Sequence, residues 1–263
     1  MKRIYLSLLL LLSLGFAYAE EPSFDSYEDS VFMEKAWRVL RVSDDGSELR
    51  KAYESVLFYA CFDNNRLAPK ACGYMGVCHK YGWYGKKDIT IANNYFEKGA
   101  KKDDAICLDE LGNSYLYGLG VEEDVNKAIE LLIKAANYNP VSYGTLGEAY
   151  LKNKDTGNAT SCLKKGVAAH YENAYYVLIN FYLDSYRSEM AYAYLIQAMD
   201  DKQTGILKDV YGENAARFEV LMGMFYESGL PPVTKDIERA KYWFSQAANH
   251  GDDWAAQRLK QLK

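Results

Sequence analysis

Few residues in this sequence have the types and spacing that catalysis needs, and a serine–lysine pair is the first of them. Ser161 is followed one helical turn later by Lys164, where the amine could activate the hydroxyl as in serine β-lactamases. The Ser-Asp-Asn and Lys-Thr-Gly elements that complete such a site do not occur in the chain. With 15 Ser and 22 Lys among 263 residues, about one such pair is expected by chance. We therefore predict no catalytic serine.

The histidines are the next candidates. They lie far apart, without the spacing of metal ligands, so we expect no metal ion and no cofactor. One of them, His79, directly follows Cys78, a pairing that can supply a catalytic thiolate. However, His79 lies 36 residues before Tyr115 in a repeat whose other copies carry tyrosine at this position, which predicts an aromatic structural role. The other histidines are His170 and His250, and the other tyrosines at this position are Tyr150, Tyr182 and Tyr226.

These positions belong to an internal repeat of about 36 residues. Shifting residues 71–104 by 36 aligns seven identical residues, among them Gly76 with Gly112 and Tyr81 with Tyr117. Repeats of 20 to 50 residues are typical of solenoid proteins. The predicted units are a divergent N-terminal hairpin at 33–70, clear copies at 71–104, 105–140 and 215–253, degenerate copies at 141–173 and 174–214, and a C-terminal cap at 254–263.

Each unit is predicted to be a helical hairpin. In unit 105–140, Ala128 and Leu132 fall on one apolar stripe of a second helix that follows a glycine-containing turn. Asp124 stands just before that helix, where its carboxylate can cap free N–H groups. Gly112 and Ala128 are small enough to let the two helices approach closely. One hairpin cannot bury its own stripe, so we predict an all-α fold, a right-handed α/α solenoid of about five to six hairpins.

The net charge restricts the kind of partner that the protein binds, and the first residues of the chain indicate its cellular location. The chain has 31 Lys+Arg against 36 Asp+Glu, a net charge of −5, which argues against a nucleic-acid partner. Residues 1–19 have the features of a signal peptide: a positive start, an apolar run at 4–14 and the small-x-small pattern Ala17-Tyr18-Ala19. That run is shorter than the about 20 residues that span a membrane. We therefore expect residues 20–263 to be exported, to the periplasm or outside the cell, without a membrane span.

The repeat resembles a known family. Residues 111–118 read LGxxYxxG and residues 127–136 read KAxxxxxKAA, a pattern similar to the Sel1-like repeat, a relative of the tetratricopeptide hairpin. The secretion signal, Cys61, Cys72 and the ending at 259–263 resemble the Helicobacter cysteine-rich protein family. That resemblance implies a disulfide between Cys61 and Cys72, the alternative being two buried free thiols. Three other cysteines lie outside the family pattern and are expected to be buried small residues or one weak pair with a leftover thiol: Cys78, Cys107 and Cys162.

A solenoid of this kind presents a concave surface lined by its first helices, and such surfaces bind proteins or peptides. We therefore expect a protein- or peptide-binding scaffold. The family resemblance implies an alternative, weak β-lactam binding or hydrolysis, with a β-lactam or a cell-wall fragment as ligand; an enzymatic activity is expected only under that alternative. Unless they serve only as ordinary exposed polar residues, the candidate binding residues are Asn113, Tyr117, Glu148, Lys152, Asn180 and Asp184.

Overall fold

The computed structural model describes residues 27–43, 45–61, 66–83, 85–207 and 216–262. Within these residues the chain forms 13 α-helices and no β-strand, which confirms the all-α prediction. The predicted signal peptide, residues 1–19, lies outside the described residues. The helices are α2 (Tyr27–Val42), α3 (Gly46–Cys61), α4 (Ala68–Tyr81), α5 (Ile89–Ala100), α6 (Ala105–Tyr117), α7 (Val125–Tyr138), the short 3₁₀ helix η1 (Pro140–Ser142), α8 (Tyr143–Lys152), α9 (Thr156–Ala168), α10 (Glu172–Asp184), α11 (Ser188–Thr204), α12 (Arg217–Ser228), α13 (Ile237–Asn249) and α14 (Asp253–Gln261).

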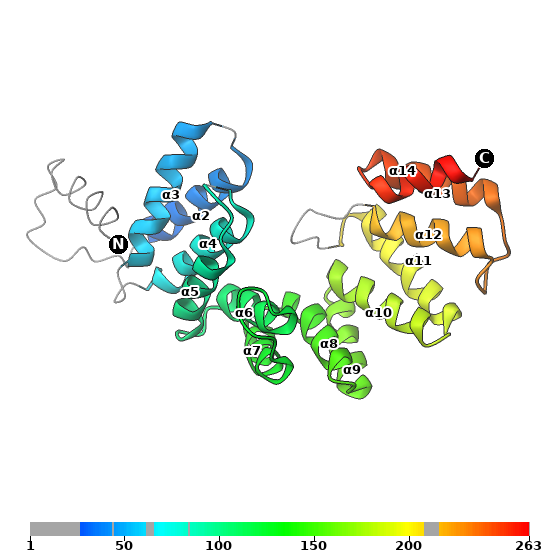
Figure 1. Cartoon of the computed structure of the whole chain (residues 1–263), viewed down its shortest axis with the longest axis horizontal. Helices are drawn as coiled ribbons and strands as arrows, with labels where there is room; N and C mark the ends of the chain where they lie inside the picture. The colour runs from blue at the N-terminus through cyan, green and yellow to red at the C-terminus, as the bar shows by residue number, and fades with distance from the viewer. Residues whose placement is uncertain (1–26, 44, 62–65, 84, 208–215, 263) are drawn as a thin grey trace, which may run out of the picture.

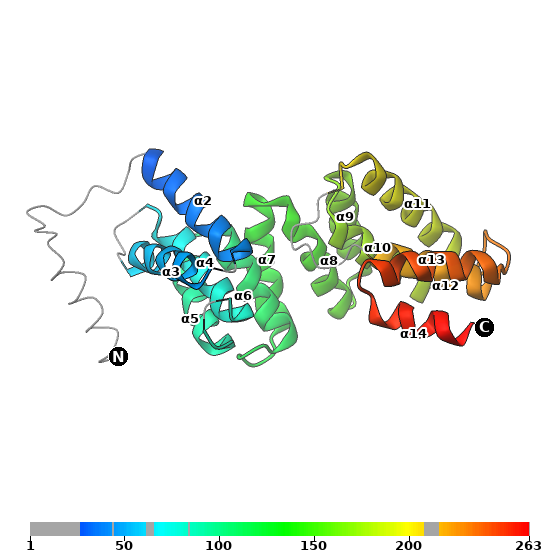
Figure 2. The same ribbon diagram turned by 90° about the horizontal axis from the view of Figure 1, so that it is seen from above.

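Consecutive helices pack in pairs, from α2 with α3 to α12 with α13, and α14 packs on α13. The first helices of the pairs also contact one another along the chain: α4 contacts α6, α6 contacts α8, and α8 contacts α10. Figure 1 shows these pairs following an arch, with α6 and α8 on its inner side and α7 and α9 on its outer side. In the view from above, α6 to α9 lie between the two ends of the stack (Figure 2). The described residues thus form a solenoid whose concave side is lined by first helices.

Local sequence sets where the second helix of a hairpin begins. Four of these helices follow an aspartate whose side chain accepts a hydrogen bond from the backbone N–H three residues later, each at 3.0 Å. Asp124 caps α7 in this way, as the sequence predicts. The other three are Asp88, Asp155 and Asp236. Because the cap satisfies N–H groups that have no partner within the helix, it fixes the first turn.

A glycine in the first helix lets a large side chain of the second helix fill the space against it. A Cβ at Gly112 would lie 2.7 Å from Cγ of Leu132 and 3.5 Å from the carbonyl oxygen of Ala128, which confirms the predicted close approach. A Cβ at Gly76 would lie 2.2 Å from Cε1 of Phe96. Leu132 and Phe96 are both fully buried. The repeated glycine is therefore a packing requirement of the hairpin.

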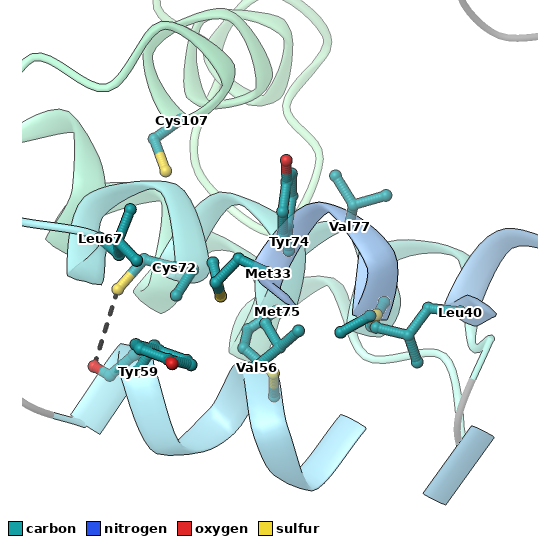
Figure 3. Packing of buried hydrophobic residues seen from close by; sticks show 14 of the residues in the cluster. Met33, Leu40, Val56, Tyr59, Leu67, Cys72, Tyr74, Met75, Val77 and Cys107 are labelled. Atoms are coloured by element: carbon teal, nitrogen blue, oxygen red, sulfur yellow. Dashed lines mark hydrogen bonds between the residues drawn. The ribbon is translucent and has the colours of Figure 1, made fainter. Parts of the chain in front are cut away.

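The core continues along the stack rather than gathering at one centre. At the N-terminal end, Figure 3 shows Met33 and Leu40 of α2, Val56 of α3 and Met75 of α4 packed together. α2 begins at Tyr27, ahead of the predicted start of the first unit at residue 33. Similar clusters follow at α6 to α9, at α9 to α12 and at α12 to α14. Each hairpin therefore depends on its neighbours for burial, as expected of a solenoid.

Candidate functional site

The six candidate binding residues form two rows on the first helices α6, α8 and α10. One row lies one turn before the C-terminal end of each helix and is half-exposed on all three helices. The other row lies at the C-terminal ends and is exposed. The equivalent positions thus share the same environment in successive hairpins, which supports the repeat alignment. The half-exposed row is Asn113, Glu148 and Asn180, and the exposed row is Tyr117, Lys152 and Asp184.

Three of these residues come together between α6 and α8. Tyr117 donates a hydrogen bond to Glu148, and partial burial of its hydroxyl together with this carboxylate raises the pKa of Tyr117. The Lys152 ammonium lies 5.8 Å from the centre of the Tyr117 ring. It donates to the Leu116 carbonyl at 2.7 Å and pairs with Glu123 at 2.8 Å. These side chains therefore join two hairpins as well as facing solvent, so part of the predicted binding surface is structural.

The remaining candidates lie on either side of this contact. On α10, the Asn180 amide donates to the Tyr176 carbonyl at 2.9 Å, which orients its side chain. Asp184 is exposed at the end of the same helix, and Asn113 is half-exposed on α6. A carboxamide offers both donors and an acceptor, the same groups that a peptide backbone presents. The chemistry of this surface suits hydrogen bonding to an extended chain.

His79 fills the aromatic position that the repeat predicts. Its Nε2 lies 3.1 Å from the Tyr53 hydroxyl, and its ring stacks on Tyr95 with centroids 5.7 Å apart. Burial lowers the pKa of His79, against an opposing effect of Asp88. At the equivalent position of the next hairpin, Tyr115 accepts a hydrogen bond from Lys127 at 2.6 Å. The ring at this position therefore contacts the second helix of its own hairpin, and that of His79 also contacts α3 of the preceding hairpin.

The four cysteines whose side chains the structure describes are buried or half-buried. Cys78 and Cys107 are fully buried, and burial raises the pKa of both thiols, that of Cys78 to about 12. Cys162 is half-buried, and its pKa is also raised by burial. Cys72, in the core shown in Figure 3, has its sulfur 3.9 Å from the Ala60 carbonyl oxygen. The side chain of Cys61 lies outside the described residues, so its disulfide with Cys72 stays a prediction.

The serine–lysine pair lies on a helix surface. Ser161 and Lys164 are both exposed on the surface of α9. Across the described ranges, no group of three or more His, Cys, Asp or Glu side chains could hold a metal ion. In the same part of the chain, no helix has the length and apolar character needed to cross a membrane.

A buried carboxylate on α11 is a feature that the sequence did not reveal. Asp201 is 5% exposed and accepts hydrogen bonds from the Tyr175 hydroxyl at 2.5 Å. His170, which follows α9 with a positive φ of 61°, places Nδ1 2.8 Å from the same carboxylate oxygen. The three residues join two successive hairpins. Their separations of 26 and 31 residues match no repeat spacing, so no sequence signal pointed to them.

Comparison with known families identifies the repeats. A family model described as Sel1 repeat matches residues 69–104, 105–137 and 217–252. These segments contain the hairpins α4/α5, α6/α7 and α12/α13. No curated protein matches the sequence.

Three solved structures are similar to this chain. A Sel1 repeat protein from Oxalobacter formigenes is similar with a TM-score of 0.63 and 21% identity, over 88% of this chain and 89% of that chain. A protective antigen of uropathogenic Escherichia coli with an SLR fold has a TM-score of 0.49 and 18% identity, over 88% of this chain and 56% of that chain. A Sel1 repeat protein from Klebsiella pneumoniae has a TM-score of 0.48 and 15% identity, over 74% of this chain and 93% of that chain.

Proposed function

We propose that this chain, which carries Sel1 repeats as its sequence predicts, is a scaffold that binds an extended segment of a partner protein along its concave surface. Sel1 repeats generally mediate protein–protein interaction. The observation that carries the proposal is the pair of rows on α6, α8 and α10, where equivalent positions of three successive hairpins hold exposed or half-exposed polar side chains. A peptide that crosses successive first helices meets one such pair at each hairpin. Concave surfaces of solenoids bind partners in this way.

Asn113 and Asn180, at the two ends of this surface, have a different role from the residues between them. Asn113 and Asn180 supply hydrogen bonds to the backbone of the bound segment. The contact among Tyr117, Glu148 and Lys152 holds α6 and α8 in register, so it keeps the spacing of the surface constant. Asp184 adds an exposed negative charge at the α10 end. The preferred segment is therefore polar and carries a basic side chain at that end.

Site-specific photocrosslinking in the cells that make the protein tests the proposal. A photoreactive phenylalanine analogue replaces Asn113 or Asn180 in one set of chains. In the control set it replaces Glu130 on α7 or Lys164 on α9, both exposed on second helices. We expect a protein adduct of defined mass from the first-helix positions only. Equal labelling from both sets, or no adduct from Asn113 and Asn180, contradicts the proposal.

The alternative of a β-lactam ligand has a direct test. Purified protein is incubated with a chromogenic cephalosporin, and product is followed by absorbance. The scaffold proposal expects no turnover above the rate without protein. Turnover that a single substitution abolishes would replace the scaffold proposal with a hydrolase.

We propose further that the protein is exported after removal of residues 1–19. The signal-peptide features of the sequence support this, as does the family resemblance. Mass spectrometry of the protein recovered from outside the cytoplasm should give a chain that begins at Glu20. In the same material, peptide mapping without reduction should recover Cys61 and Cys72 joined. An uncleaved cytoplasmic chain contradicts export, and free thiols at both cysteines in exported material contradict the disulfide.

A further inference from the structure

The regular stacking of hairpins changes between α11 and α12. Among the described residues, α4, α6, α8 and α10 contact each other in succession, whereas α10 and α12 approach less closely, with the Arg217 guanidinium 4.7 Å from the centre of the Tyr176 ring. α11 has 17 residues, the greatest length of any described helix, and ends at Gly205 in the left-handed conformation with φ 75°. The two hairpins meet through α11 and α12 and through this contact of α10 with α12.

A shallow, open groove of about 530 Å³ lies beside the contact of α11 with α12. We call it the junction groove. Two of the helices that line it, α11 and α13, are second helices, so it is separate from the rows on α6, α8 and α10. Its lining residues are Ile196, Met199, Asp200, Lys202, Gln203, Glu219 and Trp243.

The α11 wall of the junction groove presents apolar and polar side chains on one face of the helix. Ile196, Met199, Asp200 and Gln203 fall at positions i, i+3, i+4 and i+7, which is one face of a helix. Ile196 is 43% exposed although it is a large aliphatic residue. Trp243 of α13 is half-buried across the groove. A stripe two turns long that faces an apolar wall matches the surface on which an amphipathic helix docks.

The charged side chains at the junction groove favour a positively charged binding partner. The Glu219 carboxylate is neutralised within the protein, because Lys202 Nζ lies 2.7 Å from Oε1 and His250 Nδ1 lies 3.2 Å from Oε2. Asp200 is exposed at the rim, and its side chain adds a negative charge. The whole chain carries a net charge of −5. A basic occupant complements both the rim and the long-range field of the protein.

We propose that the junction groove binds a basic amphipathic helix of a partner protein. Aliphatic or aromatic side chains of that helix pack against Ile196, Met199 and Trp243. A lysine or arginine on its flank lies beside Asp200. Methionine and tryptophan suit this role, since methionine adapts its shape and tryptophan supplies a large buried area. This site is independent of the peptide surface on the first helices.

The test uses the full chain and a synthetic helical peptide as probe. The labelled 18-residue peptide carries Leu or Phe at i, i+4 and i+7 on one face and Lys on the flanks. Its matched controls are the same peptide with every Lys replaced by Glu and a scrambled sequence of equal composition. Fluorescence anisotropy measures binding at two salt concentrations. We expect the basic helix to bind about tenfold more tightly than either control, with affinity falling as salt rises.

Variants then locate the site. Ile196→Glu should weaken the basic helix about tenfold or more, because it places a carboxylate in the apolar wall of the groove. Asp200→Lys should weaken it and strengthen the acidic control. Glu130→Lys makes the same charge change on α7 and should leave binding within about twofold. Circular dichroism checks that each variant is folded, since all three positions are exposed. Equal binding of basic and acidic helices, no binding at millimolar peptide, or equal effects of Asp200→Lys and Glu130→Lys would overturn the proposal.

Discussion

Gly76→Ala should destabilise the protein although alanine is the better helix former. The added Cβ would lie 2.2, 2.5 and 2.8 Å from three carbons of the Phe96 ring. Carbon atoms pack best at about 3.5 to 4.0 Å, so the ring must move by roughly 1 Å or more. Phe96 is fully buried, which places the cost near the upper end of the about 1 to 3 kcal/mol seen for overpacking. Alanine regains about 1 kcal/mol through helix propensity, leaving a net loss of about 2 kcal/mol.

A double-mutant cycle with Phe96→Ala isolates this contact. Phe96→Ala alone should cost about 3 to 5 kcal/mol because it leaves a cavity. Once the ring is gone, Gly76→Ala should be neutral or stabilising by up to about 1 kcal/mol. Urea denaturation followed by circular dichroism measures all four chains.

Gly157→Ala is the matched control. Its Cβ would meet only Asp155 Oδ1, at 3.7 Å, so it should raise stability by up to about 1 kcal/mol. The packing explanation is refuted if Gly76→Ala costs the same with and without the Phe96 ring. It is refuted equally if Gly76→Ala behaves like Gly157→Ala.

Three further predictions concern titration, capping and thiol reactivity. Burial lowers the pKa of His79 below its ordinary 6.5, so the unfolded chain takes up a proton more readily than the folded one. The free energy of unfolding should therefore fall as the pH drops from about 7 to 5. In urea titrations, His79→Tyr should reduce that fall. Identical pH slopes for the two chains would contradict this. Asp124→Ala removes the cap of α7 and should cost about 1 kcal/mol by thermal denaturation, whereas Glu122→Ala, exposed in the same turn, should cost little. Iodoacetamide should label half-exposed Cys162 before buried Cys78 in the native protein, as peptide mass mapping will show; labelling of Cys78 first would mean that the core opens there.

Local features of the fold could be predicted because neighbouring residues determine them. The Asp124 cap involves atoms within one helical turn, and the glycine of each first helix recurs with the repeat. The exposure of the two candidate rows follows from the same periodicity, since equivalent positions face the same direction in every hairpin. What the repeat could not indicate is that Tyr117, Glu148 and Lys152 meet one another. Their contact depends on the angle at which α8 packs on α6, which is a property of two hairpins together.

The sequence by itself determined the all-α class, the repeat length and the hairpin turns, because these depend on periodicity, glycine and aspartate caps. Only the tertiary structure decided how hairpins join. The contact of Asp201 with His170 arises between two hairpins, whereas Tyr175 contacts Asp201 within one hairpin. The junction groove is lined by residues of α11, α12 and α13, which belong to two hairpins. Contacts between units depend on the positions of whole helices, and small differences in packing angle and in connection length change which side chains meet.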